Sequence, residues 1–171
     1  MTHIPVTMTN EDSTKIRALR AVVESLRADL ATALQAADIA RDEATSPESK
    51  AENKYDTRAI EAGYLAGARA RRVGELRVAL GRFELLLQQP VAGGTASRYV
   101  VARVEGGESC AFLLGPGGAG VSFELDGVRV RVLTAASPLG SRLADAEEGD
   151  ELVVRLEDGA RVERWTVEHV E

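Results

Sequence analysis

Four acidic side chains surround a predicted turn at residues 45–49, and their spacing is suited to binding a metal ion. Asp42 and Glu43 precede the turn, and Glu48 and Glu52 lie within and just after it. Residues four apart on a helix lie on one face, so Glu48 and Glu52 can present two carboxylates together. Carboxylate oxygens, with retained waters, are the ligands that Mg²⁺ prefers. The same acids are also ordinary for solvated helix ends, because acids in a first turn complement the helix dipole.

The turn itself allows two starts for the helix that follows. Pro47 disfavours a helical residue before it and can open a helix as its first residue. Alternatively, Ser49 is the N-cap and Glu52 returns a hydrogen bond to its backbone amide, as in a capping box. The second start leaves Glu48 outside the helix and occupies Glu52. The sequence leaves both starts open.

Two long helical patterns flank this turn and must position the acids. In each pattern, small and apolar residues recur at alternating spacings of three and four, as in a coiled-coil seam. The first seam consists of Ile16, Leu19, Val23, Leu26, Leu30, Ala33, Ala37, Ala40 and Ala44. The second consists of Tyr55, Ala59, Ala62, Ala66, Val73, Leu76, Leu80, Phe83 and Leu87. Arg69 interrupts the second seam, and we expect it to pair with Asp29 or to extend its charged end into solvent.

A short connection favours antiparallel packing of the two helices. About 35 residues of helix at ~1.5 Å per residue predict a prong of roughly 50 Å. We therefore predict an antiparallel coiled-coil finger over residues 1–91, with an acidic tip near residues 42–52.

A linker around Gly93 and Gly94 separates the finger from a β-rich head over residues 96–171. In the head the apolar period changes to two, and Asp126-Gly127 and Asp158-Gly159 each lie between strand-like runs, which is a hairpin signal. Residues 139–146 resemble one short helix with Ser137 as its N-cap. The sequence thus predicts an α+β fold whose head has about five strands and one helix.

Composition excludes several function classes. The net charge of −6 disfavours nonspecific binding to a nucleic-acid backbone. A single cysteine, Cys110, rules out an internal disulfide framework and favours a cytoplasmic protein. No apolar run approaches the ~20 residues of a membrane span, and the N-terminal residues do not resemble a signal peptide. The Gly115-Pro116-Gly117-Gly118 loop lacks the lysine and the helix of a phosphate-binding loop.

Four stretches, in order along the chain, resemble the Gre-type transcript cleavage factors of bacterial RNA polymerase. Residues 4–19 resemble the family's entry into its first helix. Glu52-Asn53-Lys54-Tyr55 resembles the stretch after the family's tip, and Gly63, Tyr64 and Gly67 resemble its glycine–aromatic spacing. Ser137-Pro138-Leu139-Gly140, with Leu143, Gly149 and Asp150, resembles the signature of its head.

The resemblance implies an FKBP-like head that docks on RNA polymerase, with Ser137, Pro138 and Leu139 in the docking surface. It implies that the finger enters the secondary channel of the polymerase. There Glu48, Glu52 and Asp42 would share a Mg²⁺ ion with the polymerase active site, close to the RNA 3′ end. The chain would then be a monomeric accessory factor that stimulates the polymerase's own hydrolytic activity. It would bind no metal alone and contact no membrane.

The tip departs from the family pattern, which leaves other functions open. The family's acids are three residues apart, whereas Glu48 and Glu52 are four apart. A regulator that occupies the channel without stimulating cleavage is therefore the second hypothesis. A prolyl isomerase or chaperone is the third. It would need an aromatic-lined pocket, for which the head has Tyr99, Phe112, Phe123 and Trp165.

Overall fold

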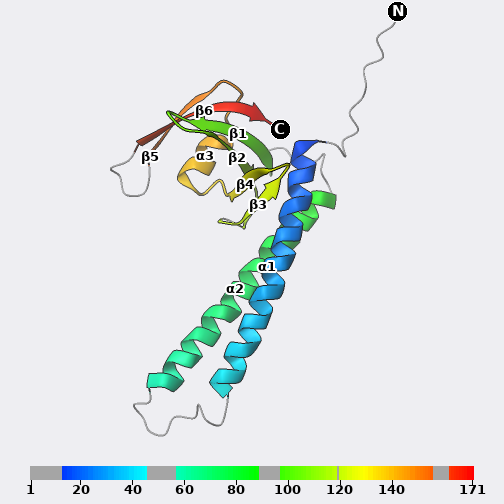
Figure 1. The fold of residues 1–171 in the computed structure, drawn as a ribbon, viewed down its shortest axis with the longest axis vertical. Coiled ribbons are helices and arrows are strands. Elements are labelled where there is room, and N and C mark those ends of the chain that lie inside the picture. Colours follow the sequence, from blue (N-terminus) through cyan, green and yellow to red (C-terminus); the bar gives the residue numbers. More distant parts are fainter. Residues whose placement is uncertain (1–12, 46–56, 89–96, 119, 156–161) are drawn as a thin grey trace, which may run out of the picture.

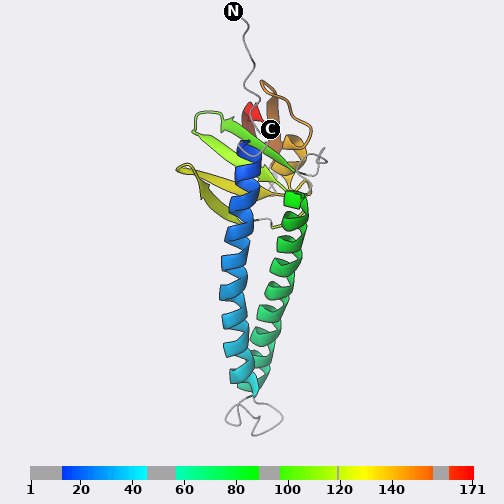
Figure 2. The ribbon, with the colours of Figure 1, turned by 90° about the vertical axis from the view of Figure 1, so that its right-hand side faces the viewer.

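Two long antiparallel helices form a prong that projects from a β-rich head. The computed structural model describes residues 13–45, 57–88, 97–118, 120–155 and 162–171. Helix α1 (Thr14–Thr45) and helix α2 (Thr57–Gln88) have 32 residues each. That length corresponds to a helix of roughly 48 Å. Figures 1 and 2 show the free end of the prong at the opposite end of the molecule from the sheet. The predicted helical hairpin is confirmed.

The predicted seams are buried most completely at the base of the prong. On α1, Ile16, Leu19, Val23 and Leu26 are buried, while of the seam residues nearer the tip only Ala40 is. Ala18 and Val22, which lie outside the predicted seam, are also fully buried. A second face of α1 is covered because the head packs against it.

Arg69 finds a partner that the sequence did not predict. Its Nη1 donates a hydrogen bond to the backbone carbonyl of Ala36, at 2.8 Å. Of the two expectations for Arg69, the pairing with Asp29 is wrong, since the guanidinium instead bonds a backbone carbonyl of the facing helix, which can accept a second hydrogen bond.

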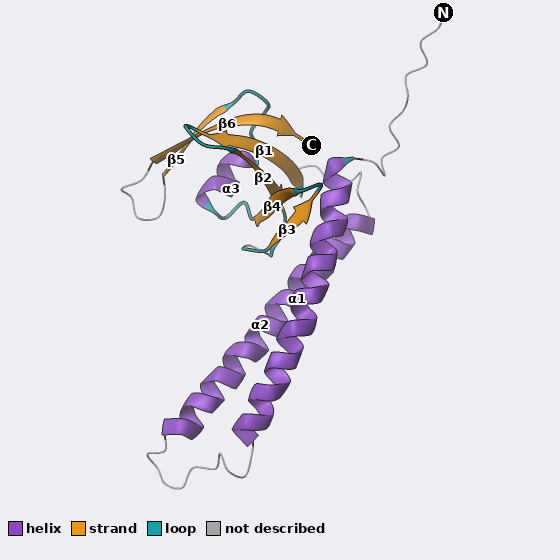
Figure 3. Ribbon diagram, in the orientation of Figure 1, coloured by secondary structure: helices purple, strands orange, loops and turns teal. Residues whose placement is uncertain are grey.

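The described part of the head contains six strands and one short helix, which Figure 3 distinguishes by colour. The strands are β1 (Arg98–Val104), β2 (Ser109–Leu114), β3 (Ser122–Leu125), β4 (Val128–Leu133), β5 (Glu151–Arg155) and β6 (Val162–Val170). The helix α3 (Pro138–Leu143) lies between β4 and β5. The sheet order is β3-β4-β2-β1-β6-β5, and all neighbours are antiparallel except β2 and β4. The α+β fold class is confirmed, with six strands where about five were expected.

The Asp126-Gly127 turn has the backbone that its sequence predicts. Asp126 has a φ of 53° and Gly127 a φ of 78°, so both lie in the left-handed region. A two-residue hairpin turn of this kind matches the twist of the strands it joins, here β3 and β4.

One hydrophobic core joins the base of the prong to one face of the sheet. Along β2, Ala111 and Leu113 contribute to this core, whereas Phe112 and Leu114 face the other side. The shared core also contains Leu19 and Leu26 from α1 and Leu76 and Phe83 from α2. The prong and the head are therefore packed as one unit. The predicted boundary between them falls at residues 89–96, outside the described residues.

Phe83 is a fully buried side chain of α2 that packs against the head. It is 0% exposed, and a Cβ added at Gly115 would lie 2.3 Å from its Cζ atom. Only glycine leaves room for the ring at that position. Arg82, the preceding residue, donates a hydrogen bond from Nη1 to the Pro116 carbonyl at 2.8 Å. The glycine-rich loop at residues 115–118 thus forms a surface of the head on which α2 packs.

Helix α3 covers part of the other face of the sheet. Leu143 and Ala146 pack there with Phe112 and Trp165, whose rings meet edge to face with centroids 5.6 Å apart. Gly140 allows the helix to follow the preceding strand closely, because a Cβ at this residue would lie 2.1 Å from the Thr134 carbonyl oxygen.

Candidate functional site

The acids at the tip of the prong lie partly within the described residues. Asp42 is in the last turn of α1, and its side chain is 75% exposed. Among the described residues, Arg41 pairs with it, with Nη2 3.6 Å from the Asp42 carboxylate. Glu48 and Glu52, together with both predicted starts of the second helix, fall outside the described residues. Asp42 is therefore the one predicted tip ligand whose surroundings are known, and it is open to solvent.

Asp42 and Glu43 occupy an unfavourable position in α1. Carboxylates near a helix C-terminus oppose the helix dipole and cost roughly 0.3–1 kcal/mol each. The last turn of α1 contains no basic residue, but the neighbouring Arg41 lies 3.6 Å from the Asp42 carboxylate and offsets part of this cost. Dipole complementarity, which could account for acids that open a helix, does not account for these two.

Ser137 is positioned by the start of α3. Its backbone is extended, and its Oγ accepts a hydrogen bond from the Gly140 N–H at 3.0 Å. The same hydroxyl donates to the Thr134 carbonyl at 2.9 Å. Both bonds are internal, so Ser137 serves as the N-cap of α3.

Pro138 and Leu139 differ in exposure. Pro138 is exposed at the first turn of α3, whereas Leu139 is half-buried and packs against the core under that helix. Of the three predicted docking residues, Pro138 is therefore the one most available to a partner.

A groove of about 450 Å³ runs between α3 and the β5–β6 hairpin, with Pro138 on its wall. The other lining residues are Ser141, Arg142, Val153, Val154, Arg155 and Val162. Val153 and Val162 are more than half exposed, and two arginines flank them. The groove thus combines apolar surface with positive charge. Sequence spacing could have indicated Ser141 and Arg142, which follow Pro138 by one helical turn. It could not indicate the strand residues.

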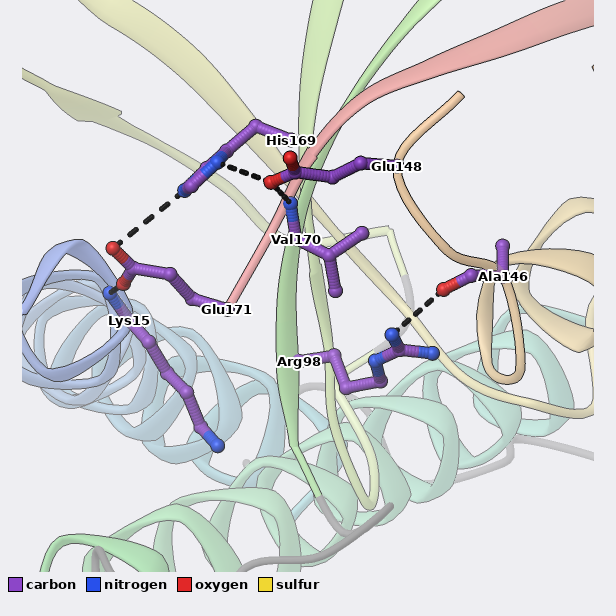
Figure 4. A network of polar contacts seen from close by, with 7 residues as sticks. All are labelled: Lys15, Arg98, Ala146, Glu148, His169, Val170 and Glu171. Atoms are coloured by element: carbon purple, nitrogen blue, oxygen red, sulfur yellow. Dashed lines mark hydrogen bonds and ion pairs between the residues drawn. The ribbon is translucent and has the colours of Figure 1, made fainter. Parts of the chain in front are cut away.

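The end of β6 and Glu171, the residue that follows it, connect the head to the start of α1 (Figure 4). The Glu171 carboxylate accepts hydrogen bonds from the Ser13 hydroxyl at 3.0 Å and from the Lys15 N–H at 2.7 Å. His169 lies between two acids, with Nδ1 2.8 Å from Glu148 and Nε2 3.6 Å from Glu171. A carboxylate at a helix N-terminus satisfies its unpaired amides and complements its dipole. This junction holds the direction of the prong relative to the head.

We expect the junction to weaken in acid. Burial alone would raise the pKa of Glu171, but hydrogen bonds from the Lys15 amide, Ser13 and His169 outweigh it and lower that pKa below the ordinary 4.5. A depressed carboxyl pKa contributes stability above the unfolded pKa and loses it as pH falls through the folded value. Glu171→Gln should therefore lower the melting temperature at neutral pH and have little effect in strong acid. A pH series of thermal melts tests this, and a difference that grows towards acid would contradict it.

The aromatic side chains of the head are mostly buried. Tyr99, Phe112, Phe123 and Trp165 are each no more than 8% exposed, and all four belong to the two cores. Trp165 also lines a hollow of about 240 Å³ beside β1, β5 and β6, and the other three are not among its lining residues. The third hypothesis, a prolyl isomerase or chaperone, needs a fuller aromatic lining than this and stays a prediction.

Two features are absent from the described residues. Within these residues, no group of three or more histidine, cysteine, aspartate or glutamate side chains could hold a metal ion. None of the described helices is both long enough and apolar enough to cross a membrane.

Comparison with known proteins returns similarity in structure but not in sequence. No protein-family model and no curated protein matches the chain. A crystal structure of GreA factor homolog 1 (Gfh1) of Thermus thermophilus is 17% identical, covers 93% of this chain and 96% of its own, and gives a TM-score of 0.33. Gfh1 of Thermus aquaticus is 16% identical, with coverages of 92% and 94% and a TM-score of 0.33. A third structure, of the transcription factor Gfh1, is 18% identical, with coverages of 93% and 94% and a TM-score of 0.34. Values this low assign no family to the chain.

Proposed function

We propose that this chain is a Gre-type accessory factor of RNA polymerase. In this proposal the head docks on the polymerase and the prong enters its secondary channel. The observation that carries the proposal is a prong of two 32-residue helices, with acids at its free end, packed firmly against a compact head. A slender element can reach a site that a globular domain cannot enter. The four sequence stretches that resemble the Gre family support the same conclusion.

The chemistry proposed for the tip is assistance to the polymerase rather than catalysis by the chain alone. Glu48, Glu52 and Asp42 would supply carboxylates to a Mg²⁺ ion shared with the polymerase. Such an ion stabilises the attacking or leaving oxygen when a phosphodiester is hydrolysed. The exposed carboxylate of Asp42 fits this role, since it is accessible from the end of α1.

The second candidate is a channel-occupying regulator that does not stimulate cleavage. The pairing of Asp42 with Arg41 favours it, because a neighbouring cation competes with a metal ion for the carboxylate. A transcript cleavage assay on a stalled, backtracked elongation complex separates the two candidates. Both predict binding to polymerase, and only the first predicts cleavage above the polymerase's own rate. Failure to bind at micromolar concentrations would contradict both.

The groove beside Pro138 is the proposed docking surface of the head. We expect Arg142→Glu combined with Arg155→Glu to weaken polymerase binding without lowering the melting temperature. Both side chains line the groove, and α3 and β5 do not depend on them for burial. Reversal of charge on a binding surface acts mainly through repulsion of the partner.

Ser137→Ala is the control for loss of stability. It removes the N-cap of α3 and should lower the free energy of unfolding by about 1 kcal/mol, without changing the charge of the groove. Unaltered polymerase binding by the double arginine variant, measured by co-sedimentation, would remove the groove from the docking surface.

A further inference from the structure

One face of α2 carries large apolar side chains that are more than half exposed in the described chain. Ile60, Tyr64, Val78 and Leu85 are 53%, 76%, 55% and 62% exposed. Helical geometry places them opposite the buried seam of α2, and so away from α1. With Arg71 and three glycines they form a continuous row, which we call the outer stripe. Its members are Ile60, Tyr64, Gly67, Arg71, Gly74, Val78, Gly81 and Leu85.

The outer stripe has the spacing of a second coiled-coil seam. Its members are spaced alternately by four and three residues, and from Tyr64 onwards large residues alternate with glycines along the helix. Gly67, Gly74 and Gly81 recur every seven residues. A row with this period keeps one face towards a partner helix over its whole length.

The glycines of the stripe have no explanation within the described chain. A Cβ added at Gly74 or Gly81 would meet nothing within 4 Å, and one at Gly67 only Arg71 Nη1 at 3.7 Å. Each glycine inside a helix costs roughly 0.5–1 kcal/mol relative to alanine. The helix therefore gives up stability for space that its own described neighbours do not use. Such space admits side chains from another helix.

We propose that the outer stripe binds the outer stripe of a second copy of this chain, with the two α2 helices antiparallel. One register places Tyr64 opposite Gly81 of the second copy and Gly67 opposite its Val78. The same register places Arg71 opposite Gly74 and Leu85 opposite Ile60. Two-fold symmetry repeats every one of these contacts in the other direction. Each large side chain then faces a glycine or an apolar partner.

Charges beside the stripe agree with this register. Positions that flank a seam set partner choice and orientation through ion pairs. The register brings Glu61 opposite Arg82 of the second copy, and the symmetry makes this pair twice. Arg82 uses Nη1 for the Pro116 carbonyl, and a guanidinium has further N–H groups.

A parallel pair would fit worse. It would place Arg71 against Arg71, whose charges repel, and glycine against glycine, which leaves the space unfilled. The sizes and charges of the side chains in the outer stripe therefore favour a second copy of the chain, packed antiparallel, as its binding partner.

The pairing affects whether the prong can enter a narrow channel. A prong covered along α2 by a second prong is too wide to enter. The dimer would therefore be an inactive form, and the monomer would be the form that inserts. The self-association itself concerns the free protein and does not depend on the proposed function.

Sedimentation of the free protein over a range of concentrations tests the proposal. We expect a reversible shift from monomer to dimer as concentration rises from micromolar towards millimolar. A monomer throughout that range would overturn the proposal, whatever other partner the stripe then binds.

Cysteine cross-linking tests the register. In a Cys110→Ser background, Tyr64→Cys combined with Gly81→Cys should give a disulfide-linked dimer under mild oxidation. The two positions lie too far apart along one rigid helix to react within a chain. Tyr64→Cys alone should cross-link poorly, and efficient cross-linking of that single variant would indicate a parallel pair and refute the register.

Charge reversal tests the flanking pair. Glu61→Arg should weaken the dimer about tenfold, since two exposed ion pairs become repulsive. Adding Arg82→Glu should restore most of the affinity. Glu75→Arg is the matched control, because the register sets Glu75 opposite Ala68. Equal effects of Glu61→Arg and Glu75→Arg would speak against the register.

Discussion

Phe83→Ala is expected to lower the free energy of unfolding by about 3–5 kcal/mol, a large fraction of the stability of a domain. The ring is fully buried where α2 meets the loop at residues 115–118, and Gly115 has no side chain that could refill the space. The cavity would therefore persist. Because the core is shared, we expect the hairpin and the sheet to lose stability together. Chemical denaturation followed by far-ultraviolet circular dichroism measures this loss.

Ile39→Ala is the matched control for that experiment. Ile39 is an apolar residue of α1 that is 56% exposed, so its truncation removes little burial and should change stability by less than about 0.5 kcal/mol. Tryptophan fluorescence of Trp165, which lies in the head, adds a second probe. If the fluorescence transition stays fixed while the helical signal is lost early, the prong and head do not depend on one another, and the importance given to Phe83 is wrong.

Glu48→Ala and Glu52→Ala are each expected to reduce stimulated transcript cleavage by about tenfold or more while leaving polymerase binding nearly unchanged. Even groups that only orient a metal ligand give losses of roughly that size. Neither residue lies in the head, where docking is proposed. The free protein should show no nuclease activity, because two carboxylates alone bind Mg²⁺ weakly. Cleavage of a backtracked RNA, read on a gel, is the measurement.

Asp38→Ala is the control for the tip, since Asp38 is an exposed acid one turn further from the end of α1. The capping-box alternative makes a different forecast. It predicts that Glu52→Ala lowers helix stability by about 1 kcal/mol and that Glu48→Ala does little. Wild-type protein that binds polymerase without raising cleavage above the basal rate would favour the non-cleaving regulator.

Local patterns predicted the elements of this fold well. The seam residues from Ile16 to Leu26, and Val73, Leu76 and Phe83 of the second seam, are buried as their spacing indicates, while Leu80 is partly buried. Asp126-Gly127 forms the turn that its residue types favour, and Ser137 caps α3. These features depend on residues close together in the chain, where backbone preference and periodicity decide the structure.

Contacts between distant residues were not predictable in the same way. The sequence of the glycine-rich loop at residues 115–118 shows only that it lacks a phosphate-binding motif, yet in the structure this loop contacts Phe83 of α2. Glu171 reaches the first turn of α1 from the far end of the chain. The docking groove likewise joins α3 to β5 and β6, and its strand residues come together only once the sheet has formed. Periodicity indicates which residues are buried but not which partner buries them.

The shared core at the base of the prong also affects how precisely its free end is placed. Because each helix is roughly 48 Å long, a tilt of about 1° at the base moves the free end by about 0.8 Å. Groups that take part in chemistry must be held to within about 0.5 Å. The rigidity of the base of the prong therefore decides how precisely its free end is positioned. Phe83 and the hydrogen bond between Glu171 and Lys15 contribute to that rigidity. Substitutions that loosen the packing at the base should therefore make the position of the acids at the free end less precise, although the substituted residues do not contact these acids.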